Sequence, residues 1–201
     1  MKVTPLDRIL LLVTGLLAAW QVAVGINGAE ALPMIAYTIA FGVLLVAGLL
    51  LIILGFDLLD SPIVVIVSTI IPLSLSLGLV WEHLAAYRPL YLVFVIVGFL
   101  AILLTRLLPL RNKLPVMVLA FVHGIAGLVI FILPIYLSIT GQAASGFSLV
   151  GVGGALIGVG GLLLSFLKAG RPLLSRAAIL KVLPGLLLLT TAAFVAGFHF
   201  G

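Results

Sequence analysis

The chain has 201 residues, of which 65% are hydrophobic and 7% charged, and its formal net charge is +5. Soluble domains carry about 25% charged residues, so this composition excludes an ordinary soluble enzyme or binding domain. The absence of cysteine excludes disulfides, thiolate metal sites and iron–sulfur clusters. The basic residues fall at predicted helix ends, which favours lipid headgroups and membrane topology over nucleic acid as the reason for the positive charge.

Long apolar segments follow one another along the chain, separated by short breaks that contain Gly, Pro and charged residues. A helix of about 20 apolar residues spans a bilayer core, and each of these segments is about that long. We therefore expect one all-α transmembrane domain over residues 1–201, a bundle of seven helices with the N-terminus inside and the C-terminus outside. The predicted spans are 6–26, 33–56, 62–81, 88–107, 115–138, 146–168 and 180–199.

The N-terminal segment resembles a secretory signal, because Lys2 and Arg8 precede a long apolar run and Ala29-Glu30-Ala31 has the form of a cleavage site. Its apolar run from Ile9 to Ile26 is longer than the about 7–15 residues of a signal sequence, so we interpret it as a retained helix. The second predicted helix opens at Pro33 and carries small residues that allow close helix packing, namely Ala36, Ala40, Gly48 and Gly55.

The third predicted helix begins with a cap and a first-turn proline, Asp60-Ser61-Pro62, and carries the main polar face of the chain. Pro72 cannot donate a backbone hydrogen bond, so it frees the carbonyl of Ser68 one turn earlier. With three hydroxyls, those of Ser68, Thr69 and Ser76, this carbonyl could line a hydrated path for a small neutral solute. We favour the alternative, in which the hydroxyls satisfy the backbone around the proline kink or bond neighbouring helices.

Arg88-Pro89 opens the fourth predicted helix, and His123 is the titratable residue that lies well inside the fifth. An ionisable residue at that depth could move protons, take part in haem- or quinone-linked redox chemistry, or ligate a metal. His83 and His199 are predicted at the outer surface, too far away to be a second haem ligand. We favour a neutral histidine that is hydrogen-bonded between helices.

Glu82, His83 and His199 form a candidate zinc site, because one carboxylate and two imidazoles can bind zinc if the third and seventh helices are neighbours. Their spacing matches no metal motif, and we favour solvated caps at the helix ends. We therefore predict no metal and no other cofactor.

Glycine distinguishes the sixth predicted helix, where one face is almost free of side chains and is formed by Gly151, Gly154, Gly158, Gly161 and Ser165. Faces of this kind let helix backbones approach closely in lipid, which predicts packing against neighbours within the chain or in another subunit. The alternative is a helix that slides or rocks. Before and within the seventh helix lie basic residues that we expect to contact lipid headgroups, namely Lys168, Arg171, Arg176 and Lys181.

Two signals support the predicted orientation. With the N-terminus inside, every Lys and Arg except Arg88 falls in an inner segment, in accordance with the positive-inside rule. The aromatic residues that prefer the headgroup zone all fall near outer helix ends, namely Trp20, Tyr37, Trp81, Tyr87, Tyr91 and Tyr136. Gly42–Gly55 and Ala155–Gly170 also read alike, which would pair the first three helices with the last three, but chance similarity is the favoured explanation in a chain this rich in Gly and Leu.

No catalytic constellation is visible, so we expect a protein that is not an enzyme. The first hypothesis is a non-catalytic subunit or scaffold of a membrane complex, which packs against other membrane subunits or against itself and binds lipid but no nucleic acid. The second is a passive transporter or channel for a small neutral or apolar solute, lined by the polar face of the third helix and His123. The third is a haem- or quinone-linked redox subunit. We expect a multi-pass protein of a prokaryotic inner or plasma membrane.

Overall fold

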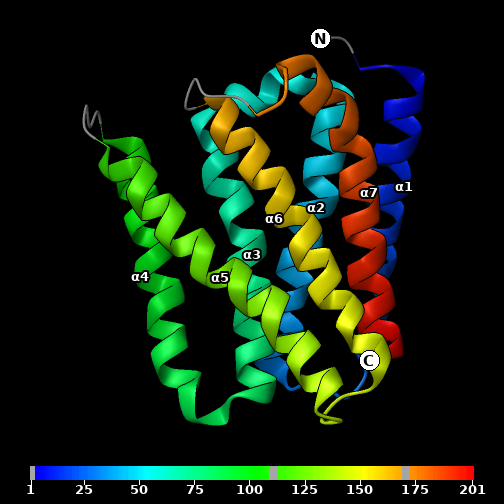
Figure 1. Cartoon of the computed structure of the whole chain (residues 1–201), viewed down its shortest axis with the longest axis vertical. Coiled ribbons are helices and arrows are strands. Elements are labelled where there is room, and N and C mark those ends of the chain that lie inside the picture. The colour runs from blue at the N-terminus through cyan, green and yellow to red at the C-terminus, as the bar shows by residue number, and fades with distance from the viewer. Residues whose placement is uncertain (1–2, 109–112, 169–172) are drawn as a thin grey trace.

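The computed structural model describes residues 3–108, 113–168 and 173–201, and within these ranges it contains helices and turns but no strand. The helices run up and down the bundle (Figure 1). They are α1 (Pro5–Val24), α2 (Ala31–Leu54), α3 (Pro62–His83), α4 (Arg88–Leu107), α5 (Leu114–Ile139), α6 (Ser148–Lys168) and α7 (Arg176–Phe200). Short 3-10 turns, η1 (Phe56–Asp60), η2 (Ala85–Tyr87) and η3 (Ser145–Phe147), lie between some of them.

The predicted helices are confirmed within a few residues, and the differences have local causes. The first helix begins at Pro5 because Thr4 and Asp7 form a capping box, in which each side chain bonds the backbone N–H of the other. The seventh begins at Arg176, earlier than predicted, because the hydroxyl of Ser175 accepts a hydrogen bond from a backbone N–H in the first turn. Ser61 does precede the first-turn proline of α3, but its side chain makes no capping hydrogen bond.

Six of the helices form a closed ring in which α1, α2, α3, α5, α6 and α7 each pack against the next, and α7 packs against α1. Helix α4 lies outside this ring against α3 and α5, and its buried residues are Gly98 and Ile102 alone (Figure 1). The ring thus joins the first three helices to the last three, with α4 as the connecting element.

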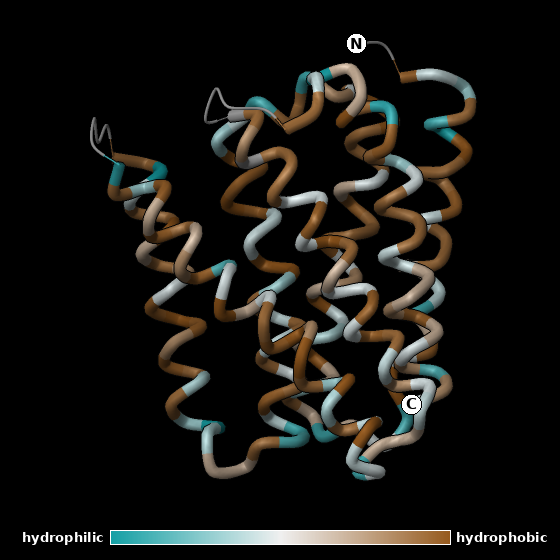
Figure 2. The backbone as a smooth tube through the Cα atoms, viewed as in Figure 1, coloured by the Kyte–Doolittle hydropathy of each residue, from teal (hydrophilic) through white to brown (hydrophobic). Residues whose placement is uncertain are grey.

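Apolar side chains fill the ring. The main cluster includes Tyr37, Phe41, Leu79, Ile130 and Phe194, which come from α2, α3, α5 and α7 and are almost completely buried. A second cluster joins α1, α2 and α7 around Phe56, and a third joins α3, α4 and α5 around Ile102. Large apolar residues also cover the outside of the helices, and hydrophilic residues gather mainly at the two ends of the bundle (Figure 2).

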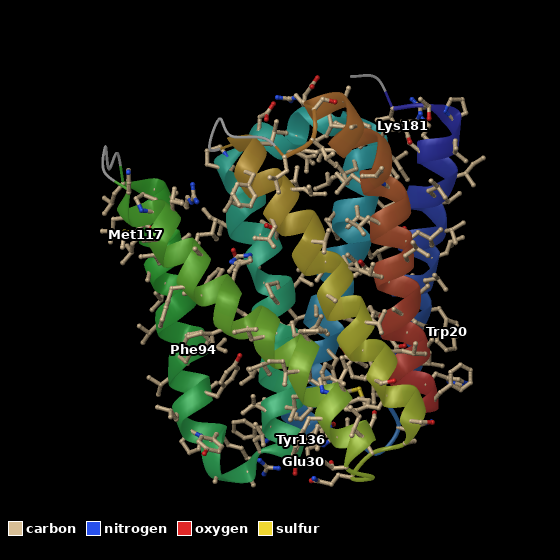
Figure 3. All side chains as sticks on the ribbon, viewed as in Figure 1. Trp20, Glu30, Phe94, Met117, Tyr136 and Lys181 are labelled. Atoms are coloured by element: carbon tan, nitrogen blue, oxygen red, sulfur yellow. The ribbon has the colours of Figure 1, made fainter. Side chains whose placement is uncertain are left out.

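All seven helices are long and apolar enough to cross a membrane. Consecutive helices run in opposite directions, and Figure 3 shows Glu30 and Tyr136 near one end of the bundle and Lys181 near the other. We call these two ends the Glu82 end, which also holds Glu30 and Tyr136, and the Lys181 end, which also holds Arg8 and Lys113.

Candidate functional site

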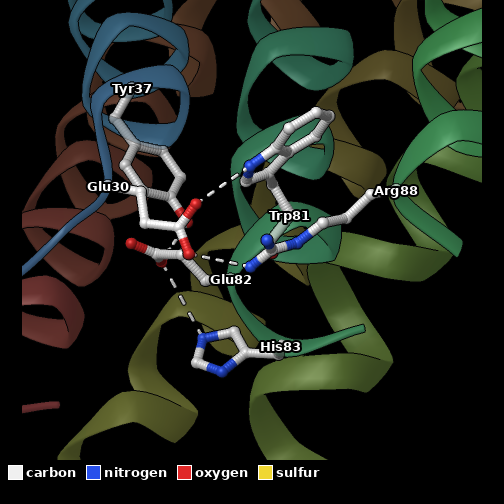
Figure 4. A network of polar contacts seen from close by, with 6 residues as sticks. All are labelled: Glu30, Tyr37, Trp81, Glu82, His83 and Arg88. Atoms are coloured by element: carbon white, nitrogen blue, oxygen red, sulfur yellow. Dashed lines mark hydrogen bonds and ion pairs between the residues drawn. The ribbon is translucent and has the colours of Figure 1, made fainter. Parts of the chain in front are cut away.

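A network of polar side chains lies at the Glu82 end and joins the start of α2 to the end of α3 and the start of α4 (Figure 4). Glu30 accepts hydrogen bonds with both carboxylate oxygens: Nη2 of Arg88 lies 2.9 Å from Oε1, and Nε1 of Trp81 lies 3.2 Å from Oε2. The Arg88 guanidinium also donates from Nε to the backbone carbonyl of Trp81 at 2.5 Å, and it lies over the Trp81 ring at 5.4 Å. Glu30 is therefore an ion-paired carboxylate.

Glu82 has a different environment, because its hydrogen-bond donor is a neutral phenol. Oη of the buried Tyr37 donates to Oε2 of Glu82 at 2.8 Å, and Nε2 of His83 lies 3.9 Å from the same oxygen. The side chain of Glu82 is only 19% exposed, against 56% for that of Glu30. Within the described residues, no Lys or Arg pairs with Glu82, and its nearest basic group is the imidazole of His83.

The Tyr37 hydroxyl reaches Glu82 because α3 has a glycine one turn earlier. A Cβ atom at Gly78 would overlap the Tyr37 ring, so only glycine leaves room for the phenol at this position. The ring is covered on another side by Phe198 of α7, with 4.7 Å between the ring centroids. Three helices thus hold the phenol in place beneath the carboxylate.

A cavity of about 370 Å³ opens beside this network. Glu30, Glu82 and His83 supply its polar wall, and Ile26, Phe147 and Phe198 are among its apolar lining residues. The His83 ring packs against Phe147 with 5.2 Å between centroids. The arrangement offers one carboxylate without a cationic partner and aromatic surface in a partly enclosed space, which is suited to a small cationic group.

The candidate zinc residues do not come together as a set. Glu82 and His83 are adjacent, but the His199 ring packs against Trp20, with 5.9 Å between centroids, and against Phe200. Among the described residues, no group of three or more His, Asp or Glu side chains could hold a metal ion.

The hydroxyl groups on the polar face of α3 donate hydrogen bonds to backbone carbonyls of the same helix. Ser68 and Thr69 both donate to the Val65 carbonyl, at 3.1 and 2.7 Å, and Ser76 donates to the Pro72 carbonyl at 2.6 Å. Thr69 and Ser76 are fully buried, whereas Ser68 is exposed. These are the backbone interactions that we favoured for this face, and they leave the hydroxyls without free donors for a solute.

His123 lies partly buried in α5. Its Nδ1 atom is buried and has no hydrogen-bond partner, and Nε of Arg106 is in the same situation. His83 and His199 lie at the Glu82 end and do not reach it. His123 is therefore separated from the other two histidines, and the hydrogen bond between helices that we favoured for it stays a prediction.

The glycine stripe of α6 divides into two halves. Cβ atoms at Gly151 and Gly154 would lie 2.6 Å from the Phe131 carbonyl oxygen and 2.8 Å from Cγ2 of Ile130, so this half packs tightly against α5. Gly158 and Gly161 are exposed, and Cβ atoms there would meet nothing within 4 Å. Helices α5 and α6 diverge towards the Lys181 end (Figure 1). Other small residues pack inside the chain, for example Gly48, which faces the backbone of α1.

At the Lys181 end, Nη2 of Arg176 lies 2.8 Å from Oδ2 of Asp60, and both residues line a cavity of about 150 Å³. Lys181 is exposed. The side chain of Lys168 and the whole of Arg171 lie outside the described residues, so the predicted headgroup cluster is described only in part.

Sequence reasoning missed the Tyr37–Glu82 hydrogen bond and the Glu30–Arg88 ion pair, whose partners are 45 and 58 positions apart. A buried tyrosine opposite the pattern Gly78-x-x-x-Glu82 is a signal that could have been read only once α2 and α3 were known to be neighbours. No protein-family model, curated protein or solved structure matches the chain.

Proposed function

We propose that the chain is a multi-pass membrane protein that acts without catalysis, as a subunit of a membrane complex, and that a transmembrane helix of another chain packs on its open glycines. These open glycines are Gly158 and Gly161 of α6 and Gly124 and Gly127 of α5. The observation that carries the proposal is that Cβ atoms at all four positions would meet nothing within 4 Å.

The position of these glycines on their helices supports the proposal. Gly158 and Gly161 continue the face on which Gly151 and Gly154 receive α5, because residues three, four and seven apart share one side of a helix. In lipid, the hydrophobic effect does not bring helices together, because the acyl chains are as apolar as the side chains. Helices therefore associate by close backbone contact at small residues. A partner helix with large apolar side chains would fill the space that these glycines leave.

The two ends of the bundle support an orientation for this subunit. Arg8, Lys113 and Lys181 lie at one end with most of the described basic residues, whereas Trp81 and Tyr136 lie at the other. Excess basic charge marks the cytoplasmic side of membrane proteins. We therefore assign the Lys181 end to the cytoplasm of a prokaryotic cell, which sets the C-terminus outside.

The test is the composition of the native assembly after gentle extraction, with wild type beside the double variant Gly158→Leu/Gly161→Leu. A Cβ atom meets nothing within 4 Å at either position in the isolated chain, so the variant is expected to fold and to lose its partner. Gly42→Leu is the matched control, because Gly42 of α2 also meets nothing within 4 Å but lies on another helix.

The expected result is an assembly of fixed stoichiometry for wild type and the control, and a lone chain for the double variant. The mass of the co-purifying component tells whether the partner is a different protein or a second copy. A wild-type protein that runs as a monomer under these conditions would refute the proposal.

A further inference from the structure

We propose that the cavity at the Glu82 end binds a primary ammonium group, with Glu82 as its counter-ion and His83 and the rings of Phe147 and Phe198 around it. The inference is independent of the partner proposed above. It rests on the charge balance, the hydrogen-bond partners and the walls of this cavity.

The charge balance selects a cation. Arg88 and Trp81 occupy both oxygens of Glu30, so this carboxylate is neutralised without a ligand. The described interactions of Glu82 leave Oε1 without a hydrogen bond, because Tyr37 donates to Oε2. A carboxylate that is four-fifths buried is costly to leave unpaired, so an ammonium ion in the adjacent cavity would be held strongly.

The walls select the kind of cation. Glu82 accepts hydrogen bonds, as His83 does in its neutral form, and an ammonium with N–H donors can supply them whereas a quaternary ammonium cannot. Phe147 and Phe198, whose ring centroids lie 6.1 Å apart, offer the aromatic surface that attracts a cation and packs its carbon chain. The volume of about 370 Å³ is enough for a small alkylamine or an ethanolamine headgroup.

Rigid support makes this site ready for its ligand. The Tyr37 phenol that holds Glu82 is itself fixed between Gly78 and Phe198, so the carboxylate does not have to be ordered when the ammonium arrives. The same chemistry can come from two sources, a free amine in solution or the headgroup of phosphatidylethanolamine, because the cavity lies where α2 begins and α3 ends.

The first experiment measures binding of n-butylammonium to the purified full chain in neutral detergent by isothermal titration calorimetry, with tetramethylammonium and n-butanol as comparison ligands. We expect saturable binding of n-butylammonium, at least about tenfold tighter than of either comparison ligand, because charge-assisted hydrogen bonds are lost with both. Equal binding of all three would overturn the proposal without the need for any variant.

The second experiment repeats the titration with Glu82→Gln, whose amide oxygen can still accept the Tyr37 hydrogen bond. Asp57→Asn, which removes a carboxylate at the opposite end of the bundle, is the control. We expect Glu82→Gln to weaken n-butylammonium binding at least about tenfold and the control to leave it unchanged. The same weakening in both variants would show a general charge effect and would contradict the assigned site.

The source of the ammonium is decided by native mass spectrometry after reconstitution with equal amounts of phosphatidylethanolamine and phosphatidylcholine. Preferential retention of phosphatidylethanolamine by wild type, lost in Glu82→Gln, identifies the headgroup as the ligand. Binding of n-butylammonium without this lipid preference identifies a free amine. If wild type shows no preference for phosphatidylethanolamine and does not bind n-butylammonium, the proposed site is refuted.

Discussion

Tyr37 and Glu82 show how one residue pair sets the chemistry at an end of the bundle. The phenol is 1% exposed and donates at 2.8 Å to a carboxylate that has no Lys or Arg partner in the described chain. A buried polar group that lacks its partner incurs the full free-energy cost of its desolvation. This cost is larger than the net stabilisation that a hydrogen bond provides. The pair is therefore expected to matter for stability as well as for the cavity.

We predict that Tyr37→Phe lowers the free energy of unfolding by about 1–3 kcal/mol, because Glu82 then keeps its burial and loses its donor. The ring remains, so the packing on Gly78 and Phe198 is preserved. Thermal unfolding followed by circular dichroism in detergent measures the change.

The matched control for this prediction is Tyr136→Phe, because the Tyr136 side chain is exposed and its loss of a hydroxyl is expected to have little effect. Equal stability of the two variants would mean that Glu82 obtains a replacement donor from water.

At the scale of the element, α6 combines two uses of glycine on one face. The half with Gly151 and Gly154 is filled by α5, and the half with Gly158 and Gly161 is open. The same residue type thus has opposite consequences within three turns. The sequence predicts the stripe, but it does not predict where α5 departs from it, because that depends on the tilt between two helices.

We predict that Gly154→Ala destabilises the chain by about 1–3 kcal/mol, since the new Cβ lies 2.8 Å from Cγ2 of Ile130 and 3.1 Å from its backbone carbonyl carbon. Gly158→Ala is predicted to stabilise the isolated chain by about 0.5–1 kcal/mol, because alanine favours the helix and the space is empty. Thermal unfolding of the two single variants measures both changes in stability. A change of the same sign in both would refute the division of the α6 glycines into a packed half and an open half.

The sequence predicts the helices well, for a physical reason. A span needs about 20 apolar residues, and its ends are marked by local features such as Pro62 or Gly55, so both can be read from neighbouring positions. The candidate sites depend on contacts between distant segments, and these fared differently. Thr69 and Ser76 bond their own helix, whereas His199 packs beside Trp20, away from Glu82. The first outcome is local to one helix and was favoured from the sequence, whereas the second depends on which helices are neighbours, which the pattern does not encode.

At the scale of the molecule, the ring of six helices with α4 outside it has the connectivity that the faint internal similarity would require. The first three helices pack in sequence, the last three pack in sequence, and α1–α7 and α3–α5 contacts close the ring. Helix α4 lies against α3 and α5 and buries only Gly98 and Ile102, so its loss would leave most of the core of the ring intact.

We predict that the two ends of the bundle lie on opposite sides of the membrane, which single cysteines can test because the chain has none of its own. Gln142→Cys, at the exposed α5–α6 turn, is expected to react with a membrane-impermeant maleimide in intact cells. Lys113→Cys, at the other end of α5, is expected to react only after permeabilisation. The reverse pattern would invert the proposed orientation.

The space that Gly78 leaves on α3 for the Tyr37 ring also determines the axial position of α2 relative to α3. The Tyr37 ring of α2 fits against the backbone of α3 at Gly78, and its hydroxyl ends on Glu82, one turn further along the same helix. A shift of either helix along its axis would drive the ring into a side chain and break the hydrogen bond. The glycine, the phenol and the carboxylate therefore give two smooth apolar helices a single axial register, which hydrophobic contact alone does not define.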